Sequence, residues 1–374
     1  MNCKYFGVCG SCNIYNVPYE EELKSKEKEV LFLVSPFGVT KLEVFSANES
    51  NYRARAEFRI WHNKNGANYA MGRLDRNGAV TIDSCPKVIE PIEKRMKPLI
   101  EAINSSNNLK NRLFTVEFLA TTTNECLITM IYHKKLDSSW EEEARELEKK
   151  LNSSIMGRSR KQKVVLSREF VTERLLIDKK EYLYRYYESG FTQPNPAINI
   201  KMVNWAIERA KSIGFGDFLE SYCGLGNFTI PISKYFSRVL ATEISKRSIQ
   251  SAKENCELNG VENIEFIRLS SEEMTQALNR EREFRRLKNI DLDSYNFSTV
   301  LVDPPRAGLD SATIELISKI DNIIYISCNP KTLARDLEEL TLTHTIDKSA
   351  IFDQFPHTHH IESGVFLQKI KSNT

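Results

Sequence analysis

The sequence lacks any apolar run near the roughly 20 residues that a membrane-spanning helix requires. Its first residues, MNCKYFGVCG, contain no basic stretch followed by an apolar one, so they do not indicate a secretory signal peptide. Internal repeats and low-complexity segments are absent too, which argues against a solenoid or a disordered chain. We therefore expect a globular, cytoplasmic protein that does not contact a membrane.

An excess of charge of one sign is also missing. The 374 residues contain 52 Lys and Arg against 50 Asp and Glu, a net charge of +2. This balance excludes a polycation that binds nucleic acid through total charge alone. At roughly 150 residues per domain, the length predicts two domains or three.

Three of the eight cysteines stand together at the start of the chain. Cys3, Cys9 and Cys12 have the spacing C-x5-C-x2-C, and Cys85 precedes a proline and is the best fourth candidate. Disulfides are disfavoured in the cytosol, so this cluster predicts a metal site. Four thiolates suit either Zn²⁺ or a [4Fe–4S] cluster. The alternative is a set of reduced, unliganded thiols.

The pattern of polar and apolar residues changes along the chain and divides it into segments. Residues 1–40 form a cysteine-containing segment with a charged amphipathic helix near its end, and residues 41–190 are rich in strand patterns. In the strand Tyr52–His62, polar side chains alternate with apolar ones, so that one face is arginine-rich. We predict a β-rich α+β domain over residues 41–190.

Residues 191–374 alternate short apolar strands with helices. We expect seven strands, at residues 216–223, 238–244, 264–270, 298–303, 323–328, 348–353 and 364–370. This alternation predicts an α/β fold with a mostly parallel sheet covered by helices on both faces.

The first of these strands leads into a glycine loop, Tyr222-Cys223-Gly224-Leu225-Gly226-Asn227, and the second ends at Glu243. Glycines at this position let a ligand approach the backbone, and an acid at the end of the second strand typically accepts hydrogen bonds from ribose hydroxyls. A full G-x-G-x-x-G is absent, which disfavours a nicotinamide site. The pattern favours a different adenosine-containing cofactor.

Two later strands end in residues that could take part in binding or catalysis. Asp303 is followed by two prolines that end its strand abruptly, and Cys328 precedes Asn329-Pro330 and a helix. Both should lie at the carboxyl edge of the sheet, where ligands bind in open α/β folds. Asp303 could instead cap a helix, and most cysteines at strand ends are inert, but the shared edge favours Cys328 as a nucleophile.

The segment 355–364, FPHTHHIESG, joins the last two strands. If the final strand runs antiparallel to the others, this segment lies at the same edge and makes Glu362 available as a base. His357, His359 and His360 suggest a metal, but no spaced fourth ligand supports one, so we expect them to face solvent or RNA.

Several blocks resemble a known family. The blocks are YRARAEFRIWH, HKKLD, SGFTQPNPAIN, ESYCGLGNF, VLATEIS, LVDPPRAGLD, YISCNP and FDQFPHTHHIESGV. From about residue 50 to the end, the chain is similar to the RNA (uracil-C5)-methyltransferases, most closely to those that act on tRNA and tmRNA. The N-terminal cysteines depart from the tRNA members and are similar to those of ribosomal-RNA members, which carry a [4Fe–4S] cluster.

The resemblance implies a Rossmann-like methyltransferase fold that uses S-adenosylmethionine (SAM). It implies that Gln193, Tyr222, Asn227, Glu243 and Asp303 bind SAM. It further implies that Cys328 adds to C6 of a uracil and that Glu362 removes the proton from C5.

The resemblance also implies a folded RNA as partner, and no obligate protein partner is indicated. The expected substrate is U54 in the T-loop of tRNA, with the equivalent loop of tmRNA. The same reaction on 23S rRNA is an alternative, and a non-catalytic Fe–S RNA-binding protein is a remote one. The β-rich domain should supply the RNA contacts. Its candidate residues are Arg53, Arg55, Arg59, His133, Lys134 and Lys135.

Overall fold

The computed structural model describes residues 1–214 and 216–371, so the last three residues of the predicted C-terminal domain lie outside it. Its larger sheet has eight strands in the order β1-β16-β17-β15-β14-β11-β12-β13. These are β1 (Glu43–Phe45), β11 (Asp217–Ser221), β12 (Arg238–Thr242), β13 (Ile264–Ile267), β14 (Phe297–Val302), β15 (Asn322–Ser327), β16 (His344–Phe352) and β17 (Glu362–Lys369). All eight are parallel except β17, which runs antiparallel between β15 and β16.

The seven strands expected from the sequence are confirmed, and β1 joins them as an eighth. It pairs in parallel with β16, Val44 opposite Ile351, although its sequence position placed it with the β-rich domain. Pattern alone could not assign this short strand, because its partner lies about 300 residues away along the chain.

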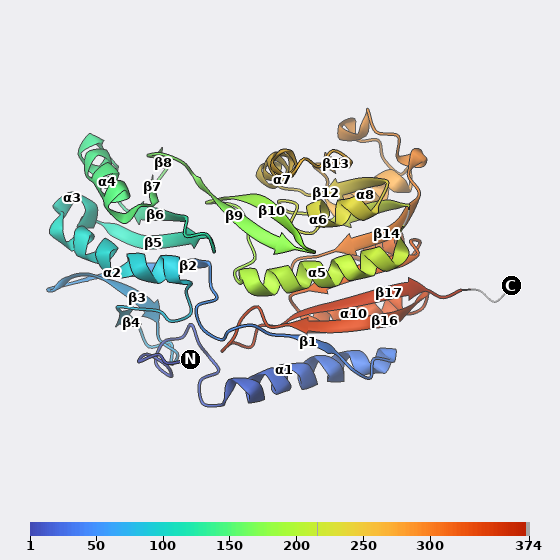
Figure 1. Cartoon of the computed structure of the whole chain (residues 1–374), viewed down its shortest axis with the longest axis horizontal. Coiled ribbons are helices and arrows are strands. Elements are labelled where there is room, and N and C mark those ends of the chain that lie inside the picture. Colours follow the sequence, from blue (N-terminus) through green and yellow to red (C-terminus); the bar gives the residue numbers. More distant parts are fainter. Residues whose placement is uncertain (215, 372–374) are drawn as a thin grey trace.

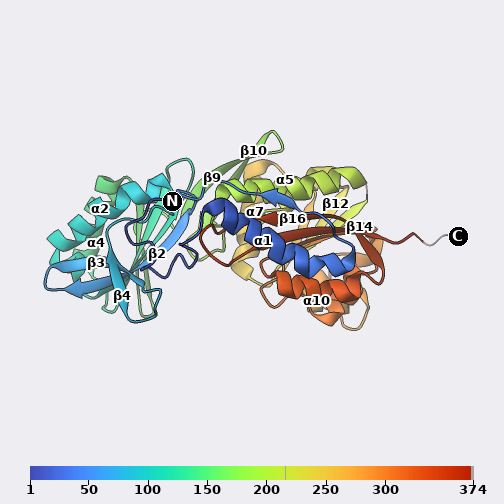
Figure 2. The ribbon, with the colours of Figure 1, turned by 90° about the horizontal axis from the view of Figure 1, so that it is seen from below.

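Helices cover both faces of the larger sheet (Figure 1). One face carries α5 (Pro196–Ile213), α6 (Thr229–Ile232) and α7 (Lys246–Asn259). The other face carries α1 (Tyr19–Val34), α8 (Ser271–Leu278), α9 (Ser311–Ile317) and α10 (Pro330–Leu340). Figure 2 shows α1 and α10 lying together on that face.

Helix α10 illustrates why these segments fold as they do. Leu333, Leu337 and Leu340 recur at helical spacing and are fully buried against the sheet. Burial of each leucine stabilises the fold by about 1.5–3 kcal/mol. The helix begins at Pro330, where the Asn329 side chain accepts a hydrogen bond from the Lys331 amide. Helix α8 ends at Leu278, and Arg280, two residues on, adopts a left-handed backbone with φ 58° that a helix does not continue through.

The second sheet has seven strands in the order β4-β3-β2-β5-β6-β7-β8. They are β2 (Arg55–Asn63), β3 (Gly66–Gly72), β4 (Ala79–Ile82), β5 (Leu113–Ala120), β6 (Cys126–Tyr132), β7 (Ser154–Ser159) and β8 (Gln162–Val165), with α2 (Glu90–Ser105), α3 (Asn107–Lys110) and α4 (Ser138–Leu151). The alternation predicted in β2 is confirmed, since Ala56, Phe58 and Ile60 are buried while Glu57 and Arg59 are exposed.

A two-stranded hairpin, β9 (Phe170–Ile177) and β10 (Lys180–Tyr187), lies between the two sheets (Figure 1). Although the sequence grouped it with residues 41–190, its apolar face packs with α5 and α7 in the core of the larger sheet. Asn255 and Asn259 of α7 fix β10 by accepting hydrogen bonds from the amides of Arg185 and Leu183. The hairpin therefore joins the β-rich part to the larger sheet.

Candidate active site

Cys328 and Glu362 meet at the carboxyl edge of the larger sheet. Cys328 follows the last residue of β15, Glu362 begins β17, and Ser327 pairs with Ser363 between the two strands. The antiparallel direction of β17 therefore returns the chain to the edge where β14 and β15 end, as the sequence predicted.

The thiol of Cys328 is half-buried, and burial, then the carboxyls of Glu362 and Asp303, raise its pKa to about 11. Burial also raises the pKa of Glu362 well above its ordinary value, and Asp303 adds to this effect. Burial alone raises the pKa of Asp303 to about 7. The three groups therefore form one electrostatic cluster in which protonated forms are favoured.

Arg306 and His360 belong to this cluster and were not assigned from the sequence. The Arg306 guanidinium lowers the pKa of both Cys328 and Glu362. Arg306 Nη2 lies 2.8 Å from His360 Nδ1. The DPPR turn was the available signal for Arg306, because the residues after a strand end lie at the same edge as the strand's last residue.

Beside this cluster, a cavity is lined by Gln193, Tyr222, Asn227 and Asp303, four of the five predicted cofactor-binding residues. Cys223, Gly224 and Leu225 of the predicted glycine loop line it too, and so do four residues that the sequence did not single out, Tyr186, Phe191, Thr192 and Phe228.

The glycine loop is held open toward the cavity. Tyr222 has a left-handed backbone, φ 65°, which is rare for a residue with a side chain and is typical of functional sites. Gly224 has φ 57°, and a Cβ there would meet no atom within 4 Å, so free space lies beside the backbone. Asn227 is fixed by two hydrogen bonds with the side chain of Asn199, of 2.9 and 2.8 Å.

Glu243, the fifth predicted cofactor-binding residue, does not line this cavity itself. It follows β12, and its carboxylate accepts hydrogen bonds from the Gly224 amide at 3.2 Å and the Ser245 amide at 2.7 Å. It therefore holds the glycine loop in place at the cavity edge, with carboxylate lone pairs to spare for a ribose.

The four N-terminal cysteines are free thiols that lie within electrostatic reach of one another. Burial raises the pKa of Cys12 to about 11, with contributions from Cys85, Cys9 and Cys3, and the Lys87 ammonium opposes this. In the described ranges, no three His, Cys, Asp or Glu side chains are placed to hold a single metal ion. The predicted [4Fe–4S] cluster at Cys3, Cys9, Cys12 and Cys85, its zinc alternative and a metal site at His357, His359 and His360 therefore gain no support from this arrangement.

The arginine-rich strand face divides into two roles. Arg55 is half-buried and donates to the carbonyl of Glu188 at 2.7 Å, so it braces the connection after β10. Arg59 lies over the ring of Phe114, 5.9 Å from its centroid, and Phe114 stacks on His133 with 4.3 Å between ring centroids. Phe114 remains 40% exposed, so this trio presents an aromatic, cationic surface to solvent.

Of the other predicted RNA contacts, Arg53 donates to the Arg55 carbonyl at 2.8 Å, and Lys134 donates to the Asn108 carbonyl at 2.7 Å. Lys134 and Lys135 line an open groove of about 980 Å³ together with Arg158, Arg160 and Lys161. The groove is strongly cationic, which suits a polyanion.

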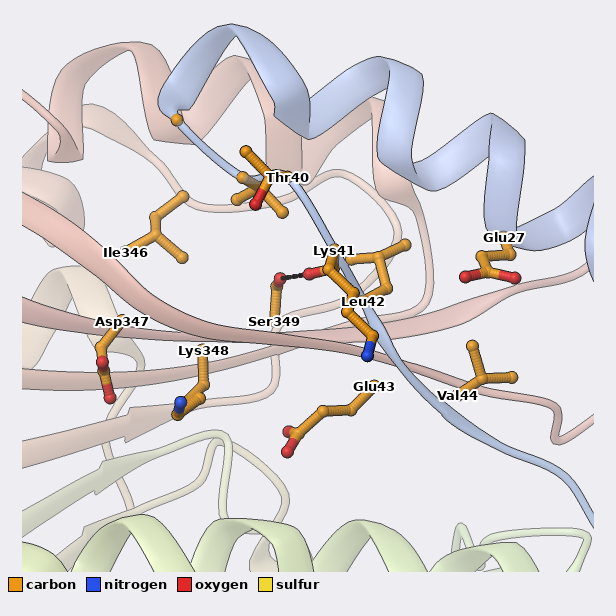
Figure 3. Close-up of a pocket in the computed structure, with 12 residues that line it drawn as sticks. Glu27, Thr40, Lys41, Leu42, Glu43, Val44, Ile346, Asp347, Lys348 and Ser349 are labelled. Carbon is orange, nitrogen blue, oxygen red and sulfur yellow. Dashed lines mark hydrogen bonds between the residues drawn. The ribbon is translucent and has the colours of Figure 1, made fainter.

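A second open groove, of about 660 Å³, lies between the α1–β1 connection and β16 (Figure 3). Figure 3 shows a hydrogen bond between two of the lining residues, from Ser349 Oγ to the Lys41 carbonyl, whose length is 3.1 Å. Its other charged side chains include Glu27 and Asp347. None of the residues that form the active-site cluster lines this groove.

None of the described helices is both long and apolar enough to cross a membrane.

Known proteins are similar to this chain over nearly its whole length. Residues 18–370 match the family model described as tRNA (Uracil-5-)-methyltransferase. A tRNA/tmRNA (uracil-C(5))-methyltransferase of a Sulfurovum species is 69% identical over 99% of this chain and 100% of its own length. One from a Nitratiruptor species is 55% identical over the same shares.

Among solved structures, the tRNA (uracil-54, C5)-methyltransferase of Pyrococcus abyssi in complex with S-adenosyl-L-homocysteine superimposes with a TM-score of 0.73. It is 25% identical and covers 95% of this chain and 84% of its own. With the match to the family model over nearly its whole length, this chain belongs to the tRNA (uracil-5-)-methyltransferase family.

Proposed function

We propose that this protein transfers a methyl group from SAM to C5 of U54 in the T-loop of tRNA, and of the equivalent uridine in tmRNA. The observation that carries the proposal is the meeting of Cys328 and Glu362 beside the glycine-loop cavity. The names of the relatives favour tRNA and tmRNA over the alternative 23S rRNA substrate.

The residues at the cavity fit SAM. The glycine loop offers free space beside its backbone at Gly224, and Glu243 stands at the end of the second strand of this alternating fold. Asp303 provides a carboxyl for the cationic part of the cofactor. The exposed ring of Phe191, 74% exposed at the cavity mouth, offers a stacking surface. When bound, SAM supplies an electrophilic methyl group.

Cys328 makes C5 of uracil nucleophilic. Its sulfur would form a bond to C6, and the electron pair of the C5–C6 double bond, released onto C5, would take the methyl group as the bond from methyl to the sulfonium sulfur breaks, leaving S-adenosyl-L-homocysteine. The thiol proton must leave first, and the Arg306 guanidinium assists because it lowers the pKa of the thiol.

Glu362 completes the reaction. After methyl transfer, C5 holds both a hydrogen and the methyl group, and the carboxylate takes that proton as general base. The electrons of the C5–H bond restore the double bond, the sulfur–C6 bond breaks, and Cys328 leaves as a thiolate. Because its pKa is raised by burial, Glu362 is a strong base once ionised.

The target base must leave the stacked loop to reach Cys328, at a cost of a few kcal/mol that pocket contacts offset. We propose that Arg59, Phe114 and His133 bind the RNA, since stacked aromatic rings with an adjacent cation suit an unpaired base. The cationic groove at Lys134 and Lys135 would take the phosphate backbone.

We also propose that Cys3, Cys9, Cys12 and Cys85 bind a [4Fe–4S] cluster. The C-x5-C-x2-C spacing and the effect of these thiols on one another's pKa support the proposal, and cysteine thiolates are the ligands such clusters use. Cys328 follows β15 of the larger sheet, whereas Cys9 pairs with Arg73 next to the second sheet, so the cluster would be structural.

The test of the methyltransferase proposal uses purified protein, SAM with a labelled methyl group, and three transcripts. These are a tRNA, the same tRNA with cytidine at position 54, and a 23S rRNA fragment. We expect label only in the first, recovered as 5-methyluridine. Label in the rRNA alone would favour the alternative substrate, and label in none would contradict the proposal.

A further inference from the structure

The segment that joins β16 to β17, residues 353–361, rests on a group of buried charged side chains that the proposed reaction does not use. We call this segment the catalytic-base loop, because Glu362 follows it. Glu22, Lys26, Asp353 and His357 are each at most 4% exposed. Buried charges are costly unless paired, so such a group calls for an explanation.

His357 stands at the centre of the group, so the expectation that it faces solvent or RNA is wrong, whereas His359 and His360 are exposed. The Nδ1 of His357 lies 3.4 Å from Glu22 Oε2, and its Nε2 lies 3.3 Å from Glu49 Oε2, so the imidazole sits between two carboxylates. Neither ring nitrogen makes a hydrogen bond there, so each contact is an ion pair only when the ring is protonated. The edge of its ring meets Phe6 at 5.1 Å between centroids. Its backbone is left-handed, φ 63°, and its amide donates to Glu22 Oε1 at 2.8 Å.

The N-terminal segment and α1 both bind this loop. The amides of Asn13 and Ile14, next to Cys12, donate to the His357 carbonyl at 3.0 and 3.2 Å. Lys26 of α1 forms ion pairs with Glu22 at 2.6 Å and Asp353 at 2.7 Å, and it donates to the Phe355 carbonyl at 3.2 Å.

On its other side the same loop contacts the proposed reaction centre. Gln354 donates to the side chain of Gln193 at 3.3 Å, His360 contacts Arg306, and Glu362 is the next residue but one after His360. The loop therefore has the N-terminal segment on one side and the catalytic side chains on the other.

We propose that His357 is a positioning residue: with its amide bonded to Glu22 and its ring held between the carboxylates of Glu22 and Glu49, it fixes the catalytic-base loop and so the placement of Glu362. A residue in the left-handed region is held there by its surroundings, and here those surroundings are α1 and residues 6–14. The proposal rests on the proposed role of Glu362, and it gives the N-terminal segment a part in the proton-removal step.

The test compares His357→Asn and Glu22→Gln with a matched control, Glu21→Gln. Asparagine tolerates the left-handed backbone, so His357→Asn removes the imidazole with little strain. Glu21 is the exposed neighbour of Glu22 in the first turn of the same helix, so its substitution changes the helix N-terminal charge equally. Each full-length variant is assayed for 5-methyluridine formation, SAM affinity, melting temperature and the covalent protein–RNA adduct that withstands denaturant.

We expect His357→Asn and Glu22→Gln each to lower kcat by about tenfold, since misplacement of a catalytic group by about 1 Å has effects of this order or larger. KM for tRNA and SAM should stay within about twofold, because binding residues are untouched. The adduct should accumulate, because proton removal is the step that is slowed. The double variant should lose little more than either single one, since both break the same contact.

A merely structural role would lower the melting temperature without adduct accumulation, and this result would overturn the proposal. So would wild-type kinetics in both variants. An inactive wild-type protein that forms no adduct would instead contradict the proposed function itself. If His357→Asn fails to bind SAM, Glu22→Gln with its control decides alone.

Discussion

Ser327 of β15 pairs with Ser363 of β17, and this antiparallel register brings Cys328 and Glu362 together although 33 other residues separate them in the chain. A nucleophile and a base that act on adjacent carbons of one ring must lie close together, as these two side chains do. The arrangement leads to predictions about each member of the site.

Substitution of Cys328 by alanine should abolish methyl transfer and leave SAM affinity nearly unchanged. In the proposed mechanism the thiol acts on the uracil and not on SAM, and Cys328 does not line the glycine-loop cavity. Labelled-methyl assays and isothermal titration calorimetry with SAM would check this. Appreciable residual turnover would remove Cys328 from the nucleophile role.

Glu362→Gln should allow methyl transfer but trap the covalent adduct between protein and RNA, because the base is needed only after the methyl group has moved. A band shifted in a denaturing gel, with label from the methyl donor, is the expected sign. Cys328→Ala combined with Glu362→Gln is the control and should give no band. Normal turnover without the band would contradict the assignment.

The reactivity of Cys328 should depend on pH and on Arg306. Since its pKa is about 11, the thiolate fraction, and with it the rate of alkylation by iodoacetamide, should rise about tenfold per pH unit between pH 8 and 10. Arg306→Gln should slow alkylation at pH 8 severalfold, because the guanidinium lowers the pKa of the thiol. Mass spectrometry of the Cys328 peptide measures this, with exposed Arg282→Gln as control. A rate independent of pH would be inconsistent with the buried thiol.

Asp303→Asn should stabilise the free protein in a pH-dependent way. The pKa of Asp303 is raised from 3.8 to about 7, so its carboxyl is harder to ionise in the folded than in the unfolded protein. The free energy of unfolding of the wild type is therefore highest below about pH 4 and falls as pH rises to about 7. The neutral variant lacks this loss. Its advantage in melting temperature should therefore grow between pH 5.5 and 7 and stay constant above, while SAM binding weakens. An advantage that is the same at pH 5.5 and 8 would refute the raised pKa.

Anaerobically purified protein should be brown and contain about four iron atoms per chain, as a cubane held by four thiolates does. Cys9→Ser should lose the colour, whereas Cys256→Ser, which changes a buried cysteine of α7, should keep it. Colourless protein with stoichiometric zinc would overturn the iron assignment. Protein without metal, and as stable as Cys9→Ser, would overturn the site.

The parts that the sequence predicted are those that depend on local order. Alternation of strands and helices after residue 195 predicted the larger sheet, and strand ends predicted that Asp303 and Cys328 share an edge. The prolines after Asp303 and the asparagine before Pro330 marked those ends in the sequence itself.

What the sequence could not predict depends on contacts between distant segments. The strand β1 is three residues long and gains its place only from β16. The hairpin β9–β10 follows the β-rich sheet in the chain but finds its apolar partner in α5 and α7. The bridge from Glu22 to His357 spans 335 residues, and no spacing rule relates its two ends.

The position of β17 between β15 and β16 also bears on how the protein is made. Strand β17, the last strand of the described residues, lies inside the sheet and begins with Glu362. Strand β1, which is early in the chain, pairs with β16 at the edge of the sheet. A nascent chain therefore holds Cys328 before it holds its base. The proposed reaction centre is completed only after β17 has been made and has paired with β15, and the pairing of β1 with β16, which lie far apart along the chain, forms slowly.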